Sequence, residues 1–472
     1  MHENSFKSTA LAALVLVLAL APALSQAYEA GVESDNAPVA ATLPALIPMT
    51  AQVTAKLPTL DNRLQKTDRL MKNLSDSSDP LREADVWGRI RSGYAIPDLN
   101  NQLVANHVNW YATRPDHLAR TTARASRYIF HVVQELEKRG MPTELALLPF
   151  IESAFNPQAF SSASAAGLWQ FVPATGRDFN LKQNMFKDDR RGVIASTDAA
   201  LTYLQRLYDM FGDWQLALAA YNWGEGSVQR AIKKNQSLGK PTDFESLADL
   251  MPAETRNYVP KLQAVKNIIA NPAQYGLSLP VVDNQPYFTA IDKTSDIDIT
   301  VAAQLAELST DEFKALNPQF NRPVIIGGEK TKILLPQENA AKFTTNLAQW
   351  GHALSSWTTH KITNARERIE TLASKFGTTA DVLRQANNIP QRMRLRAGST
   401  ILVPKTSATM NMNITQEIAD NATMLFEADR PERALKNVRR AVKGGKVQAA
   451  PISLVKPRIQ RGGGNNRAKA RH

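Results

Sequence analysis

Apolar residues recur at helical spacing through most of the first half of the chain. One such face lies near residue 85 and is formed by Val86, Trp87, Ile90 and Tyr94. Similar patterns follow over residues 98–140, 197–211, 214–222 and 254–270, with Arg139-Gly140 as a helix end and Pro142 as the next start. A helix from Pro142 ends near Glu152, since Pro149 and Asn156-Pro157 interrupt it. No alternating strand pattern interrupts 85–270, so we predict an all-helical domain over 85–275.

The pattern changes after Pro280, where two similar units follow each other. Each has a strand-like start, two short helices separated by a small polar turn, and a closing apolar strand that ends in Pro. In both units the second helix ends in Asn, as Leu-Asn or Leu-x-x-x-Asn. This weak internal repeat predicts two small βααβ modules, at 281–340 and 355–405.

The first residues have the organisation of a secretory signal. Lys7 supplies a positive charge, Ala10 to Ala21 form an apolar stretch, and Ser25-Gln26-Ala27 fits a small-x-small cleavage site. We therefore expect a signal peptide over 1–27 and an exported protein; the alternative is an uncleaved N-terminal anchor. Residues 28–84 are rich in Ala, Pro, Ser, Asp and Thr without a sustained period, which predicts a disordered leader.

Charge is distributed unevenly along the 472 residues. The formal net charge is +12, and residues 430–472 contain thirteen Lys or Arg and one Glu. The rest of the chain is balanced, which argues against a body that binds nucleic acid. We expect residues 406–472 to form a basic disordered tail. This tail either associates with anionic envelope polymers or lipid head groups, or is simply solvated.

The chain contains no cysteine. This excludes disulfides, thiolate nucleophiles, zinc sites with Cys ligands and a lipid anchor on an N-terminal cysteine. The seven histidines show no ligand spacing, and no phosphate loop or nucleotide fingerprint stands out. We therefore predict no metal and no cofactor. The sequence does not indicate an oligomeric state.

One carboxylate stands out for its surroundings. Glu152 follows the apolar run Leu147 to Ile151 and precedes a loop of Ser, Ala and Pro that leads into GLWQF. Desolvation between apolar residues raises a carboxyl pKa, which suits a general acid that protonates a glycosidic oxygen. The alternative is an ordinary glutamate at a helix end with its carboxylate in water.

Three motifs together resemble the soluble-type lytic transglycosylase (SLT) domain. They are IESAFNPQAFSSASAAGLWQF at 151–171, AYNWGEG at 220–226 and ETRNYVPK at 254–261, in the order of that family. The resemblance covers about 85–275 and implies a lysozyme-like, mainly helical fold that cleaves the MurNAc–GlcNAc bond of peptidoglycan. It also implies that Glu152 is the sole catalytic carboxylate, first as acid and then as base on the C6 hydroxyl, so that a 1,6-anhydro product forms without water.

The resemblance assigns further residues by their position in these motifs. Ser161 corresponds to a serine that hydrogen-bonds the glutamate, and Gln170 to a glutamine that contacts sugar. Tyr221 and Asn222 correspond to a pair beside the glutamate, and Glu254 to a second acidic residue at the substrate groove. The alternatives are an ordinary loop Ser161, a core Tyr221 and a helix-start Glu254. Candidates for stacking on sugar, or for core packing, are Phe155, Trp169 and Trp223.

The second small unit resembles a LysM module, a βααβ fold that binds glycans containing N-acetylglucosamine. The matching residues are Ile369, Leu372, Ala373, Phe376, Leu383, Asn387, Gly398 and Pro404. It departs from that family at 363–366, where Thr-Asn-Ala-Arg stands in place of a Gly-Asp-Thr-like turn. The first unit is a more degenerate relative, with a structural spacer as the alternative.

The predicted function is therefore cleavage of peptidoglycan glycan strands by an exported lytic transglycosylase, periplasmic or associated with the cell envelope. Two alternatives remain open. A hydrolytic muramidase shares the fold, so the fold does not separate the two reactions. A non-catalytic scaffold that binds glycan needs Glu152 to be missing or misplaced.

Overall fold

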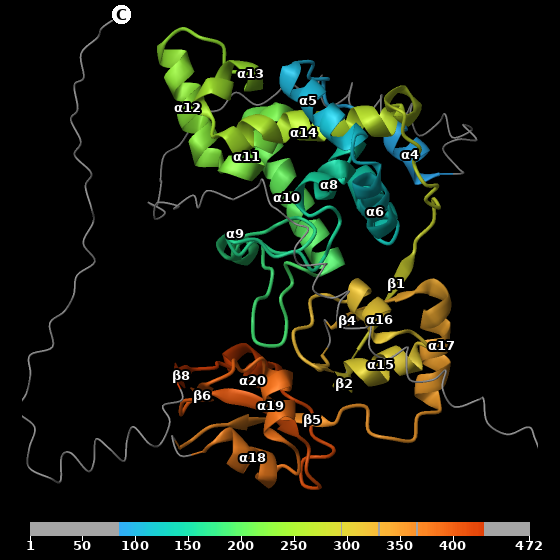
Figure 1. Ribbon diagram of the computed structural model, residues 1–472, viewed down its shortest axis with the longest axis vertical. Helices are drawn as coiled ribbons and strands as arrows, with labels where there is room; N and C mark the ends of the chain where they lie inside the picture. Colours follow the sequence, from blue (N-terminus) through green and yellow to red (C-terminus); the bar gives the residue numbers. More distant parts are fainter. Residues whose placement is uncertain (1–84, 294, 329–330, 365–366, 429–472) are drawn as a thin grey trace, which may run out of the picture.

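The computed structural model describes residues 85–428, with gaps at 294, 329–330 and 365–366. The predicted signal peptide, the leader and the chain from 429 onward lie outside this range. The described residues form a helical domain, a first small unit and a second small unit, arranged in that order down the long axis in Figure 1. This confirms the predicted architecture of a mainly α domain followed by small α/β modules.

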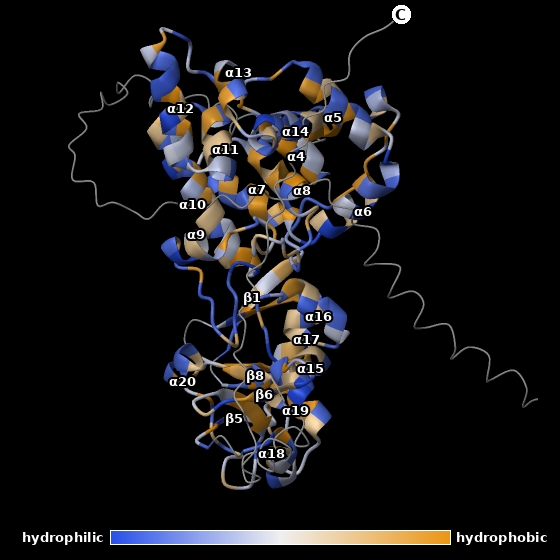
Figure 2. Cartoon of the chain, turned by 60° about the vertical axis from the view of Figure 1, so that its left-hand side comes forward, coloured by the Kyte–Doolittle hydropathy of each residue, from blue (hydrophilic) through white to orange (hydrophobic). Residues whose placement is uncertain are grey.

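The helical domain is built around one long helix, α14, which packs against α5, α8 and α11. In Figure 2 hydrophobic positions gather where α4, α7, α8 and α14 meet, which is the centre of its core. Its helices are α4 (Val86–Ser92), α5 (Gln102–Ala112), α6 (Pro115–Ala125), α7 (Ile129–Lys138), η1 (Thr143–Leu147), α8 (Leu148–Glu152), α9 (Pro173–Asp178), α10 (Val193–Phe211), α11 (Trp214–Trp223), α12 (Glu225–Ser237), α13 (Phe244–Leu247), η2 (Ala248–Leu250), α14 (Ala253–Ala270) and η3 (Pro272–Tyr275).

The boundaries of these helices follow local signals in the sequence. Gly212 ends α10 with a positive φ of 66°, a conformation that glycine adopts without steric cost. The Asp213 side chain then accepts a hydrogen bond from the backbone N–H of Leu216 and caps α11. The expected helix from Pro142 is split into η1 and α8, because Pro149 lies in the first turn of α8. Glu152 is the last residue of α8.

The two small units share one construction. The first contains β1 (Phe288–Asp292), β2 (Ile297–Asp298), α15 (Ile299–Leu305), α16 (Thr310–Leu316), β3 (Val324–Ile325), β4 (Lys332–Pro336) and α17 (Gln337–Ala348). The second contains β5 (Trp357–Lys361), α18 (Ile369–Lys375), α19 (Ala380–Asn387), β6 (Met393–Leu395) and β7 (Thr400–Pro404). In each, the first strand pairs antiparallel with the closing strand, β1 with β4 and β5 with β7.

The repeated asparagine holds this construction together. Asn387 is fully buried, and its amide donates to the carbonyls of Leu383 and Leu402 while its oxygen accepts from the N–H of Leu402. Asn317 makes the same three hydrogen bonds in the first unit, to Phe313 and Leu334. One buried amide thus ties the second helix to the closing strand in both units, which explains why the repeat keeps Asn there.

Two predicted boundaries need correction. The first unit does not end at 340, because α17 continues to Ala348 and buries Phe343 against the strands. The tail does not begin at 406, because α20 (Gln416–Asn421) and β8 (Phe426–Ala428) are ordered. β8 pairs antiparallel with β6, and Asp296 of the first unit accepts a hydrogen bond from the N–H of Ile414. The backbone of this segment is hydrogen-bonded to both small units, so the segment is ordered although its sequence has no hydrophobic period.

A loop of the helical domain joins the three parts. Residues 181–191, here called the docking loop, extend from the helical domain to the small units in Figure 1. Its backbone pairs with the first unit through Asp188 N–H to the Gln319 carbonyl (2.9 Å) and Asn321 N–H to the Phe186 carbonyl (2.8 Å). Phe186 is 3% exposed and packs in a cluster with Val324, Ile326, Leu402, Ile414 and Ala419.

The first unit also shares the core of the helical domain. Leu316 and Leu334 belong to the same apolar cluster as α14, and the Tyr128 hydroxyl donates to the carbonyl of Ala315. Arg127 of the helical domain forms a bidentate pair with Glu312, at 3.0 and 2.8 Å. The first unit is therefore packed onto the helical domain rather than attached only by a linker.

Phe186→Ala is expected to destabilise the packing between the docking loop and both small units. Removing a buried Phe side chain leaves a cavity and costs about 3–5 kcal/mol. Calorimetry is expected to show a lower-temperature transition for the small units, separated from that of the helical domain. Phe160→Ala is the matched control, because Phe160 is 64% exposed and the same change there removes little packing. A single unshifted transition for Phe186→Ala would contradict the assignment of Phe186 as the junction.

Candidate active site

Glu152 is placed at a sharp turn where α8 ends. Ala154 and Phe155 both have positive φ, 49° and 55°, which non-glycine residues rarely adopt. Two contacts hold this strained turn: Phe155 is fully buried against Phe150, with ring centroids 5.1 Å apart, and Arg124 Nε donates to the Ala154 carbonyl at 2.7 Å. The turn leaves Glu152 half-buried at the end of its helix. Backbone strain held by packing in this way is typical of functional sites.

The carboxyl of Glu152 accepts a short hydrogen bond from the hydroxyl of Tyr258 on α14. Burial raises the pKa of Glu152 to about 7, the bond from Tyr258 acts in the opposite direction, and the negative charge of Glu254 raises it further. Burial likewise raises the pKa of the Tyr258 hydroxyl, so this group stays a donor. A carboxyl with a pKa near 7 is protonated often enough at neutral pH to act as a general acid and can then serve as a base.

Tyr258 is the residue beside Glu152 that the sequence analysis did not single out. Its side chain is only 5% exposed. The available signal was its place inside the ETRNYVPK motif, four residues after Glu254. Tyr221, expected beside Glu152, has a pKa raised first by burial and then by the charge of Glu152, which lies near enough to act on it, and its hydroxyl donates to the carbonyl of Trp169 at 2.9 Å.

Asn222 and Glu254 lie together, as their motifs suggested. The Asn222 amide donates to the Glu254 carboxylate at 3.1 Å, and its oxygen accepts from the Thr255 hydroxyl at 2.7 Å. These bonds join the end of α11 to the start of α14. Glu254 acts on Glu152 through its charge, and Lys261, on the same helix, has the opposite effect on the pKa of Glu152.

Ser161 and Gln170 lie in the loop over residues 153–170, here called the motif loop, and their hydrogen bonds stay inside it. Ser161 Oγ accepts from the N–H of Ala165 at 3.1 Å, and the Gln170 amide donates to the carbonyl of Gly167 at 2.8 Å. Ser161 thus shapes the loop rather than bonding Glu152. Gly167 has a φ of 82°, and a Cβ there would lie 2.1 Å from the carbonyl oxygen of Arg190, so only glycine fits.

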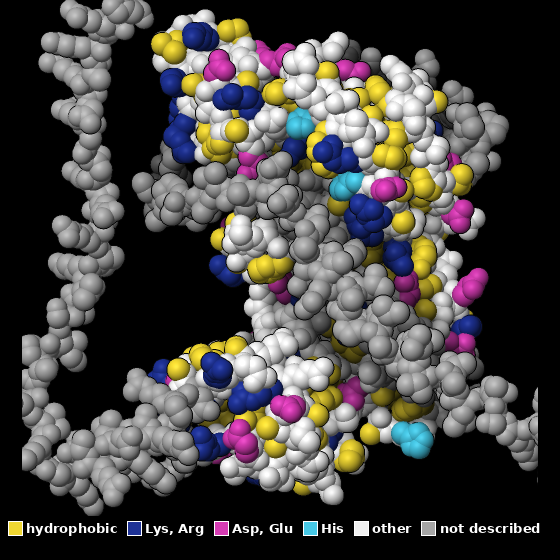
Figure 3. Space-filling model, in the orientation of Figure 1, with side chains coloured by type: hydrophobic (Ala, Val, Ile, Leu, Met, Phe, Trp, Pro, Cys, Tyr) yellow, Lys and Arg dark blue, Asp and Glu magenta, His cyan; other side chains and the backbone are white. Residues whose placement is uncertain are grey.

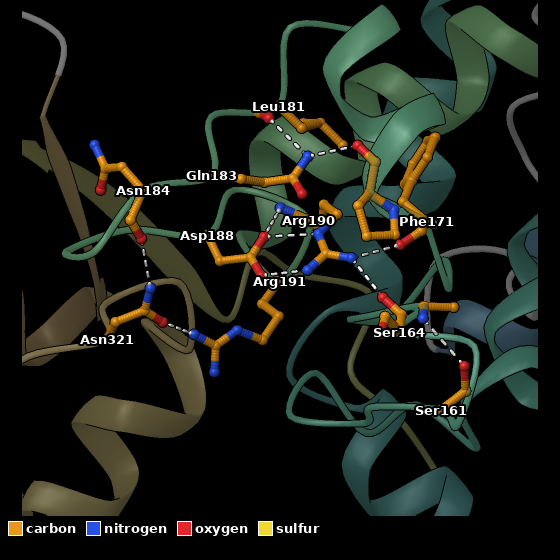
Figure 4. A network of polar contacts seen from close by, with 12 residues as sticks. Ser161, Ser164, Phe171, Leu181, Gln183, Asn184, Asp188, Arg190, Arg191 and Asn321 are labelled. Atoms are coloured by element: carbon orange, nitrogen blue, oxygen red, sulfur yellow. Dashed lines mark hydrogen bonds and ion pairs between the residues drawn. The ribbon is translucent and has the colours of Figure 1, made fainter. Parts of the chain in front are cut away.

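Arg190 holds the motif loop in place through several hydrogen bonds (Figure 4). Its guanidinium is buried, donates to both carboxylate oxygens of Asp188 at 2.9 and 2.7 Å, and also donates to the carbonyls of Ser164 (2.6 Å) and Phe171 (3.1 Å). Asp188 belongs to the docking loop and pairs with the first small unit through Gln319. A continuous set of hydrogen bonds therefore runs from the first unit to the loop beside Glu152.

The aromatic candidates separate into core and surface. Phe155 and Trp169 are fully buried, and Trp169 Nε1 donates to the Thr197 hydroxyl, so both are core residues and not sugar-stacking surfaces. Trp223 is half-buried. The exposed aromatic side chain of the motif loop is Phe160, which sequence reasoning did not single out.

Over residues 85–428 and outside the gaps, no three His, Asp or Glu side chains are grouped as the ligands of a metal ion would be. In the same range, no helix has the length and apolar character needed to cross a bilayer.

Comparisons with known proteins agree with the motifs. Family models match at residues 132–244 (Transglycosylase SLT domain), 287–351 (Lytic transglycosylase MltD, LysM-like domain) and 367–404 (LysM domain). Membrane-bound lytic murein transglycosylase D of Escherichia coli is 33% identical over 350 residues, which cover 72% of this chain and 77% of that protein. Membrane-bound lytic murein transglycosylase C of Yersinia enterocolitica is 34% identical over 223 residues, 41% of this chain and 60% of that protein.

A solved structure, the lytic transglycosylase Slt of Pseudomonas aeruginosa, aligns with 47% of this chain and 49% of its own at 16% identity. Its TM-score of 0.26 is too low to support an argument. The family models and the curated relatives confirm the resemblance inferred from the three motifs and from the LysM-type units.

Tyr258→Phe is expected to raise the pKa of Glu152 above about 7. The hydroxyl stabilises the carboxylate, and its loss leaves burial unopposed by that hydrogen bond. The titration is followed by ¹³C NMR of the glutamate carboxyls, with Glu152→Gln used to assign the signal. Tyr203→Phe is the control, because the Tyr203 hydroxyl donates to Glu225 and not to Glu152. A midpoint that stays or falls in Tyr258→Phe would remove Tyr258 from this role.

Proposed function

The chain belongs to the family of membrane-bound lytic murein transglycosylase D, and from this membership we propose a reaction and its residues. The reaction is non-hydrolytic cleavage of the β-1,4 bond between MurNAc and GlcNAc in peptidoglycan, which leaves 1,6-anhydroMurNAc ends. The observation that carries the assignment of residues is the half-buried Glu152 at the end of α8, with a pKa raised to about 7 and a hydrogen bond from the Tyr258 hydroxyl.

Glu152 acts twice in this scheme. Protonated, it gives its proton to the glycosidic oxygen, so the GlcNAc leaves with that oxygen and the proton. The resulting carboxylate then takes the proton of the C6 hydroxyl of the same MurNAc, whose oxygen bonds to C1. An intramolecular nucleophile gains from proximity, so no second carboxylate is needed to hold a water molecule. Tyr258 orients the carboxyl and stabilises its charged form between the two steps.

The remaining residues are proposed to bind substrate. Tyr221 and Asn222 line the end of α11 beside α14, and Glu254 borders the groove with its carboxylate held by Asn222. Ser161 and Gln170 shape the motif loop, which presents backbone and amide groups to the sugar.

A hydrolytic muramidase is the second candidate, because Glu254 lies close enough to influence Glu152 by its charge. In that reaction Glu254 would activate a water molecule. The amide of Asn222 occupies one of its carboxylate oxygens, which favours the non-hydrolytic assignment.

Mass spectrometry of products released from purified sacculi separates these reactions. The wild-type protein is expected to release products lighter by one water, with anhydro ends. Glu152→Gln is expected to lower turnover by at least about 10²–10⁴-fold, because the acid and the base are lost together. Its circular dichroism spectrum and melting temperature should match those of the wild type. Products with reducing ends would instead support hydrolysis and make Glu254→Gln the next variant to test.

We also propose that the protein is exported and stays with the cell envelope. The LysM-type units hold it on the glycan by raising the effective concentration of strands near Glu152. The basic segment 430–472 adds charge attraction to anionic envelope components.

Removing residues 429–472 is expected to weaken co-sedimentation with sacculi at low ionic strength. At high salt, where charge attraction is screened, the truncated and full-length proteins are expected to bind equally through the LysM-type units. A chain in which the Lys and Arg of 430–472 are replaced by Gln is the control for tail length. Equal binding of all three at low salt would leave the tail without this role.

A further inference from the structure

A line of arginines follows one side of α6. Arg114 and Arg124 share one face of the helix with His117 and Thr121, at intervals of three or four residues, and Arg120 lies beside them. Arg114 and Arg120 are exposed. In Figure 3 dark-blue and cyan side chains gather where Figure 1 places α5 and α6.

This line begins at an exposed aromatic and ends beside the candidate active site. The guanidinium of Arg114 lies over the ring of Trp110, 4.6 Å from its centroid, and Trp110 is 40% exposed. At the other end, Arg124 donates to the carbonyl of Ala154, two residues after Glu152. Ten residues of helix span about 15 Å, so the line is long enough for an extended substituent that leaves the reacting sugar.

Among the described residues, neither Arg114 nor Arg120 forms an ion pair with a carboxylate. Asp116 is the one carboxylate of α6. The pKa of His117 is lowered, first by burial and then by the positive charges of Arg124, Arg120 and Arg114. Arg127, just beyond α6, is an example of an arginine with a structural role, because its guanidinium is neutralised by a bidentate contact with Glu312. Arg190 is neutralised by Asp188 in the same way.

We propose that Arg114 and Arg120 bind carboxylates of the peptide stem carried by MurNAc, so that strands with stems are preferred to stripped strands. The inference rests on the proposed function, since the stem starts from the sugar held at Glu152. The hydroxyl and acetamido groups of the glycan are neutral and do not require a row of guanidiniums. The carboxylates of the stem are anionic, and guanidinium groups bind carboxylates through paired hydrogen bonds.

The test compares two substrates and two double variants. The substrates are soluble glycan strands with their peptide stems and the same strands after an amidase has removed the stems. R114Q with R120Q is expected to lower kcat/KM about 10-fold on the stem-bearing strands and to leave it unchanged on stripped strands. R230Q with K233Q on α12 removes the same charge from exposed positions and is expected to change neither.

Binding gives a readout that does not depend on cleavage. In a Glu152→Gln background, the preference for stem-bearing strands is measured as a ratio of Kd values, with and without R114Q and R120Q. Added salt is expected to reduce the preference of the arginine form only.

The two proposals fail in different ways. Wild-type protein that binds strands but does not cleave them would overturn the proposed function. Equal losses on stem-bearing and stripped strands would assign the arginines to the glycan itself, and a loss confined to stripped strands would assign them to the lactyl carboxylate that the amidase frees; either result would overturn the stem proposal. No loss on either substrate, with no change in the Kd ratio, would also overturn it.

Discussion

The buried pair of Arg190 and Asp188 links the parts of the molecule on which the site depends. One guanidinium neutralises a carboxylate and at the same time donates to the carbonyl of Ser164 in the motif loop and to that of Phe171 directly after it. A buried charge is tolerated only when it is paired and hydrogen-bonded, so all partners of Arg190 must be in place together. Because Asp188 also joins the docking loop to the first small unit, the conformation of the motif loop depends on a unit that is distant in sequence.

Glu144 and Glu152 are eight residues apart and differ in role because their surroundings differ. Glu144 is 1% exposed, and its carboxylate accepts from the N–H groups of Ala95 and Ile96 and contacts Lys266 at 3.1 Å. These contacts satisfy the Glu144 carboxylate, which therefore has a structural role. Glu152 is half-buried, accepts a hydrogen bond from the Tyr258 hydroxyl among the described residues, and has a pKa raised to about 7, so its proton is available near neutral pH. The two carboxylates differ in these hydrogen-bond partners and in their exposure, because Glu152 lies at the end of its helix.

The sequence predicted the helical domain, the βααβ repeat and Glu152, because each has a strong local signal. The helical period, the capping Asp213 and the repeated asparagine are read from neighbouring residues alone. The partner of Glu152 was not predictable in this way. Tyr258 and Tyr221 are both aromatic residues on apolar helix faces, and which hydroxyl reaches the carboxyl depends on how α11 and α14 pack.

For a related reason, the sequence did not predict the contacts of the docking loop or the order of the segment 406–428. Neither has a hydrophobic period, and both owe their order to backbone hydrogen bonds with other units. Phe186 is an isolated aromatic among polar residues in the sequence, and its burial arises only when two small units close over it. A segment that is ordered by contacts with residues distant in sequence need not show a hydrophobic period of its own.

The core shared between the helical domain and the first unit has a geometric consequence. Leu316 and Leu334 pack with the core of the helical domain, and Phe186 packs with both small units, so the span from the second unit to Glu152 is fixed by folding and not by chain entropy. A glycan strand bound at once to the second unit and at Glu152 would have to bridge this fixed span. For such a strand, the distance between the second unit and the bond at Glu152 would be set by the fold rather than by a flexible linker.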